Sequence, residues 1–110
     1  MTQQELYILL ADITLNLQEN PQDAGLLFNR AKVYLALNDL SKALEDLDSA
    51  IAADGSLARA YMLRGRIYFK LHNTNAAYDD LRKATSLDPG LTQDISGEYE
   101  IGQQPKVYNI

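Results

Sequence analysis

The sequence predicts an all-α protein, built as a right-handed superhelical stack of antiparallel helix-turn-helix hairpins. One observation is self-similarity at a period of 34 residues, by which residues 24–37 align with 58–71 and residues 43–55 with 77–89. Another is that apolar residues recur at steps of three and four, as they do along one face of a helix. A fixed period of this length indicates hairpins that bury their apolar faces only against each other.

The first predicted helix covers residues 2–17. Its apolar residues share one face and are Leu6, Leu9, Leu10, Ile13 and Leu17. Asn20-Pro21 is expected to end it, because the residue before a proline is pushed out of the helical region.

Four more helices are predicted at 24–37, 41–53, 57–71 and 75–87, and 91–96 is expected to add one or two turns. Turn and cap residues separate them: Asn38-Asp39, Asp54-Gly55, His72-Asn73-Thr74 and Asp88-Pro89-Gly90. Asn, Asp and Gly favour such positions because they cap helices or accept unusual backbone angles.

The two aligned copies also share a pattern of small, aromatic and large residues. Small residues let the two helices of a hairpin approach closely, and the large ones fill the space beyond the contact. The pattern consists of Ala31, Tyr34, Ala43, Leu47 and Ala50 in one copy, and Gly65, Tyr68, Ala77, Leu81, Ala84 and Pro89 in the other. It resembles the tetratricopeptide repeat family. Gly55 stands where that family usually has proline, and Leu27 where it often has an aromatic residue.

The resemblance implies two repeats, at 24–57 and 58–91. Residues 1–20 resemble the second half of a truncated repeat, because Leu9 and Ile13 fall where Ala43 and Leu47 fall one period later. Such a helix is expected to cover the apolar flank of the next one. Residues 92–110 are expected to form a short cap and an irregular tail. That tail is apolar enough to suggest docking on its own array or on a second copy.

In this family a partner binds in the concave groove that successive first helices share. The candidate groove residues are Phe28, Asn29, Lys32, Leu35 and Ala36 from one copy, and Arg59, Met62, Leu63, Arg66, Phe69 and Lys70 from the other. Their charged members are all basic, whereas acidic residues of the second helices are expected toward the convex side: Glu45, Asp46, Asp48, Asp79 and Asp80. Such a groove suits an acidic peptide with apolar anchors. Alternatively, the same residues form an ordinary solvated helix face with a partly buried apolar core.

Co-chaperone members of the family hold the C-terminal carboxylates of heat-shock chaperones in a clamp of Lys, Asn and Arg. By resemblance, Asn29 and Arg59 match two of the clamp positions. Leu63 stands where the clamp needs an arginine, and Arg64 beside it is expected to point to another face. A carboxylate-binding adaptor is therefore the weaker of the peptide-binding hypotheses.

Composition and charge limit the classes of function to be expected. The net charge is −5 and there is no cysteine. Without a basic stripe, nucleic acid and anionic membranes are not expected partners. No export signal or membrane-spanning segment is recognisable, which predicts a cytoplasmic protein. His72 is the single histidine, and its place in a turn is typical of a solvated loop residue. No metal-ligand spacing or phosphate-binding loop is present, so we expect neither cofactor, metal nor catalysis.

The sequence therefore predicts a non-enzymatic protein-interaction module or adaptor. A structural role is the alternative, in which the array ends or the tail form a weak homodimer.

Overall fold

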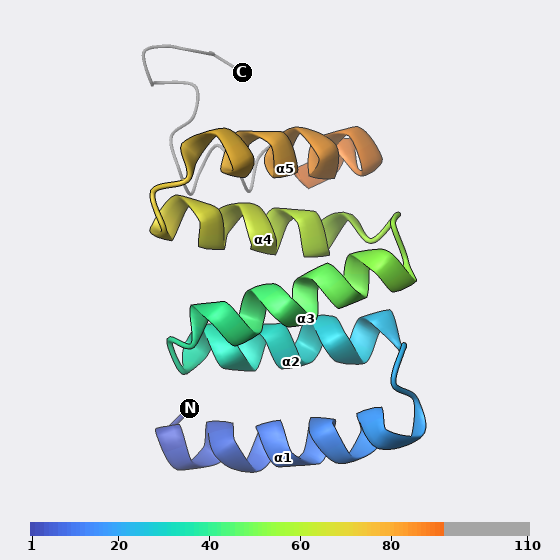
Figure 1. The fold of residues 1–110 in the computed structure, drawn as a ribbon, viewed down its shortest axis with the longest axis vertical. Helices are drawn as coiled ribbons and strands as arrows, with labels where there is room; N and C mark the ends of the chain where they lie inside the picture. The colour runs from blue at the N-terminus through green and yellow to red at the C-terminus, as the bar shows by residue number, and fades with distance from the viewer. Residues whose placement is uncertain (92–110) are drawn as a thin grey trace.

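The computed structural model describes residues 1–91, and these form five α-helices followed by a short 3₁₀-helix. The helices are α1 (Gln3–Glu19), α2 (Ala24–Ala36), α3 (Leu40–Ala53), α4 (Ala58–Lys70) and α5 (Thr74–Leu87), and the 3₁₀-helix η1 is Pro89–Leu91. They stack in chain order with alternating direction, α1 at one end and α5 at the other (Figure 1). The all-α repeat fold is thus confirmed. The predicted turns at 92–96 and the tail lie outside the described residues.

The helix ends follow from local hydrogen bonding. Side chains of Asp23, Asp39 and Asn73 accept bonds from the exposed backbone N–H groups at the starts of α2, α3 and α5. Asp39 is the reason why α3 begins at Leu40 and not at Ser41. At the other ends, Asn38 and His72 adopt left-handed φ values of 63° and 62°. The two residues are one 34-residue period apart in sequence.

Thr2 and Glu5 start α1 with a capping box. The Thr2 N–H donates to Glu5 Oε1 at 2.7 Å, and the Glu5 N–H donates to Thr2 Oγ1 at 3.1 Å. The bond from the Thr2 N–H is the main reason why the pKa of Glu5 is lowered, because it stabilises the charged carboxylate. At its other end α1 runs to Glu19, two residues past the predicted boundary.

Two hairpins, α2–α3 and α4–α5, have their closest contacts through small side chains. Ala31, Ala43 and Ala77 have no exposed surface. Gly65 marks one such close approach, since a Cβ atom there would lie 3.1 Å from the carbonyl oxygen of Ala77. The helices can approach this closely only where side chains are minimal.

The core continues between hairpins. Leu47 of α3 and Ile67 of α4 are fully buried, and both belong to the cluster that joins the two repeats. Ile13 and Leu17 of α1 pack with Leu27 and Val33 of α2 in a second cluster. As predicted, α1 covers the apolar flank of α2. Leu91 is also buried, at 3% exposure, and η1 packs on α5.

Candidate partner-binding groove

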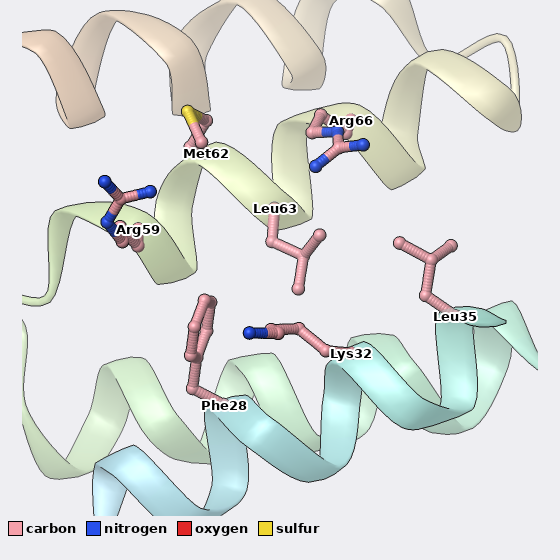
Figure 2. A pocket seen from close by; sticks show the side chains of 7 residues that line it. All are labelled: Phe28, Lys32, Leu35, Arg59, Met62, Leu63 and Arg66. Carbon is pink, nitrogen blue, oxygen red and sulfur yellow. The ribbon is translucent and has the colours of Figure 1, made fainter. Parts of the chain in front are cut away.

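The first helices of the two hairpins, α2 and α4, lie beside each other and border a cavity of about 390 Å³. Its lining residues are Phe28, Lys32 and Leu35 from α2, and Arg59, Met62, Leu63 and Arg66 from α4. Figure 2 shows the side chains of Phe28, Lys32 and Leu63 in the space between the two helices. We call this set of seven residues the α2–α4 groove.

The groove is cationic and partly apolar. It is lined by three basic residues and four apolar ones, with no acidic residue among them. The Lys32 ammonium lies 5.4 Å from the centre of the Phe28 ring, a cation–π arrangement that holds it beside an apolar surface. No ion pair joins Lys32 or Arg59 to any residue in the described part of the chain. Their charges remain available to an anionic ligand.

The structure brings some of the sequence-predicted groove residues together and separates others. Phe28, Lys32, Leu35, Arg59, Met62, Leu63 and Arg66 share the cavity, although Leu63 is only 4% exposed and belongs mainly to the core. Four others do not line it: Asn29, Ala36, Phe69 and Lys70.

Phe69 lies apart from the groove because its ring packs edge-on against Tyr78 of α5. The two ring centres are 5.1 Å apart, with an angle of 89° between the planes. Phe69 and Tyr78 also pack against Leu81, so this aromatic pair belongs to the second hairpin. Lys70 is exposed in the last turn of α4. A cation there faces the negative end of the helix dipole.

Two arginines, at equivalent positions of the repeats, lie on a different face from the groove. Arg30 donates to both carboxylate oxygens of Asp46 at 2.8 Å, and Arg64 does the same with Asp80. Each arginine also reaches the preceding second helix. Arg30 donates to Thr14 at 3.3 Å and Arg64 to Asp48 at 2.9 Å.

Aromatic rings and carboxylates together hold these arginines. The Arg30 guanidinium lies 5.8 Å from the Tyr34 ring centre, and that of Arg64 lies 5.6 and 5.9 Å from those of Tyr61 and Tyr68. Hydrogen bonding to Asp46 raises the pKa of Arg30, and hydrogen bonding to Asp80 raises that of Arg64, in each case against the effect of burial. These groups are therefore permanently charged and committed to internal pairing.

This pairing corrects the sequence interpretation of the acidic residues. Glu45, Asp48 and Asp79 are exposed, but Asp46 and Asp80 are only 5% exposed and face the first helix of their own hairpin. Asp46 follows Ala43 by three residues, which places both on one helix face. The signal was present in the sequence: an arginine precedes an aspartate by 16 residues in both repeats.

Metal-ligand groups and membrane-spanning helices are also absent from residues 1–91. Within residues 1–91, no group of three or more His, Asp or Glu side chains is arranged to hold a metal ion. No helix in this part of the chain is long and apolar enough to cross a bilayer. His72 is exposed in the turn between α4 and α5.

Comparisons with known proteins define the class. The tetratricopeptide repeat family matches residues 24–56 and 58–91, more than half of the chain. The chain therefore belongs to the tetratricopeptide repeat family. No curated protein matches it significantly.

Solved structures share the fold. The first TPR of Spaghetti (RPAP3), bound to the HSP90 peptide SRMEEVD, is similar with a TM-score of 0.81 and 26% identity, covering 92% of this chain and 80% of that one. MamA is similar with a TM-score of 0.74 and 24% identity, covering 86% of this chain but 53% of that one. The likeness to MamA concerns the fold alone.

Proposed function

We propose that this chain is a non-enzymatic protein-interaction module that binds an acidic peptide with apolar anchors in the α2–α4 groove. The observation that carries the proposal is the lining of that cavity, where basic and apolar side chains meet without an acidic residue. Repeat arrays of this kind commonly use their concave surfaces for binding.

The chemistry of the groove specifies the ligand. Lys32 and Arg59 offer charge to a carboxylate, and Phe28 and Met62 offer adaptable apolar contact. The peptide SRMEEVD, bound by the similar Spaghetti domain, combines three acidic residues with Met and Val. That composition is the one that this groove favours, which supports the same ligand class here.

The proposal is tested on a peptide array that includes SRMEEVD and acidic peptides of varied sequence. Each peptide has a neutral version with Gln and Asn in place of Glu and Asp. Acidic peptides are expected to bind more tightly than their neutral versions, and Lys32→Glu or Arg59→Glu to weaken binding by about tenfold or more. Lys70→Glu is the matched control, because Lys70 is exposed outside the groove. Equal binding by neutral peptides, or equal loss with Lys70→Glu, would refute the proposal.

The carboxylate-clamp alternative predicts that binding depends on the free C-terminal carboxylate of the peptide. Asn29, one of its two matched residues, does not line the groove, and Leu63 fills an arginine position. We therefore expect amidation of the peptide C-terminus to leave binding nearly unchanged. A loss above about tenfold would favour the clamp.

Cytoplasmic residence and weak homodimerisation stay predictions. Fractionation of the host cell tests the first. Sedimentation over a range of protein concentrations tests the second.

A further inference from the structure

Among the described helices, α1 lies at one end of the stack and is placed as the second helix of a repeat. Arg30 of α2 donates to Thr14 of α1, just as Arg64 of α4 donates to Asp48 of α3. Thr14 and Asp48 are one 34-residue period apart in sequence. Toward α2, therefore, α1 makes the contact that a second helix makes with the next repeat.

The other face of α1 carries an aspartate in the same register. Asp12 precedes Asp46 by one period, and Asp46 precedes Asp80 by one more. Asp46 and Asp80 are buried, and each accepts two hydrogen bonds from an arginine of a neighbouring helix. Asp12 is exposed, and no hydrogen bond or ion pair joins its side chain to the described residues. The acceptor half of a repeated arginine–aspartate pair is thus presented to solvent.

Apolar side chains flank this aspartate. Ile8 is 64% exposed and Leu15 is 61% exposed. Their counterparts one period later are Lys42 and Ser49, both polar. Lys42 and Ser49 stay exposed although α2 packs on α3, so these positions are not covered within the array itself. Ile8 and Leu15, four residues before and three after Asp12, lie on its helix face and give it an apolar border that suits a partner with apolar side chains.

Charge identifies the kind of partner. Glu5, Asp12 and Glu19 recur every seven residues along α1, and residues 1–23 contain no Lys, Arg or His. Two copies meeting through α1 would bring like charges together, which disfavours that dimer. A basic helix is favoured instead, and α2 and α4 show how such a helix packs on a second helix of this array (Figure 1).

We propose that the free face of α1 docks an amphipathic basic helix of a partner protein. One arginine of that helix forms a bidentate pair with Asp12, while its apolar side chains cover Ile8 and Leu15. In the described part of the chain this site lies at the end of the array, and it is distinct from the α2–α4 groove.

The probe is a fluorescent peptide with the sequence of residues 57–72 of this chain. These residues include α4, whose Arg64 forms the bidentate pair with Asp80. Binding of this peptide to the full chain is followed by fluorescence anisotropy. Asp12→Asn is expected to weaken binding by about tenfold or more, since it removes a charge-assisted bidentate acceptor. The double variant Ile8→Ser/Leu15→Ser is expected to weaken binding as well. Glu45→Gln, which removes an exposed charge from α3, is the matched control and should change affinity less than twofold.

A double-mutant cycle identifies the contact. A probe with glutamine in place of Arg64 should bind the unaltered chain more weakly, yet lose little further affinity for the Asp12→Asn chain. The variant Lys32→Glu should leave binding unchanged, because its side chain lies in the α2–α4 groove. Circular dichroism confirms that each variant is folded.

Three results would overturn the proposal. The first is no measurable binding of the probe at millimolar concentration. The second is additive loss in the cycle, which would place the arginine away from Asp12. The third is a dimer of this chain that Ile8→Ser/Leu15→Ser abolishes, which would assign the face to a second copy.

Discussion

The pair between Arg64 and Asp80 is expected to contribute strongly to stability, and Arg64→Met is the change that shows it. Loss of the guanidinium removes three charge-assisted hydrogen bonds, two to Asp80 and one to Asp48. It also leaves the carboxylate of Asp80, 7% exposed as a side chain, buried without its partner. Breaking a fully buried ion pair typically costs 3–5 kcal/mol.

The expected magnitude lies at the lower end of that range. The Arg64 side chain is 20% exposed, so water screens part of the interaction. We expect the free energy of unfolding to fall by about 3 kcal/mol, and the melting temperature to fall by roughly 12–24 °C, taking 4–8 °C per kcal/mol. Urea denaturation followed by circular dichroism measures the free energy directly.

The exposed pair between Arg82 and Asp79 provides the matched control. Both side chains are more than two-thirds exposed. Arg82→Met should therefore cost at most about 1 kcal/mol, as surface ion pairs usually do. The double variant Arg64→Met/Asp80→Leu should be more stable than Arg64→Met alone, because no charge is left buried. Equal costs for Arg64→Met and Arg82→Met, or no recovery in the double variant, would refute the reasoning.

Other changes test the remaining structural arguments. Glu5→Gln should remove the pH dependence that the capping box contributes. The lowered pKa of Glu5 stabilises α1 above the carboxyl's unfolded-state pKa, and this contribution is lost as pH falls through the folded-state value. Acid titration followed by circular dichroism compares the two chains. Ala43→Leu should cost about 1–3 kcal/mol in urea denaturation, because a larger side chain overpacks a fully buried contact. His72→Gly should raise the melting temperature slightly, by relieving about 1 kcal/mol of left-handed backbone strain, whereas Asn38→Ala should lower it; scanning calorimetry that shows the opposite order would contradict this.

Much of the fold could be predicted because its determinants are local and repeated. The helix steps and the small residues at Ala31, Gly65, Ala43 and Ala77 each appear twice in the sequence, and repetition separates signal from chance. The observed helix boundaries differ from the predicted ones by one or two residues. Such a difference arises where one capping side chain determines the first helical residue, as Asp39 does at the start of α3. Such caps depend on hydrogen-bond geometry, which composition does not specify.

The candidate groove was harder to predict because a helix face is assigned to within a residue or two. Phe28 and Arg59 lie in the predicted groove, but the Phe69 ring turns to Tyr78 of α5 and Asn29 lies outside the cavity. The burial of Asp46 was missed because aspartate is usually exposed, and its arginine is 16 residues distant. Binding in the groove depends on the partner as well as on this chain, so it stays a prediction.

The threefold attachment of Arg64 has a consequence for how the array opens. Its guanidinium joins α4 to α5 through Asp80, and to α3 through Asp48. A single side chain thereby contacts both hairpins, and the buried cluster shared by α2, α3 and α4 joins them further. We therefore expect amide hydrogens in α3 and α5 to exchange through a shared, cooperative opening, whereas α1, held by fewer such bonds, frays on its own at a lower free energy.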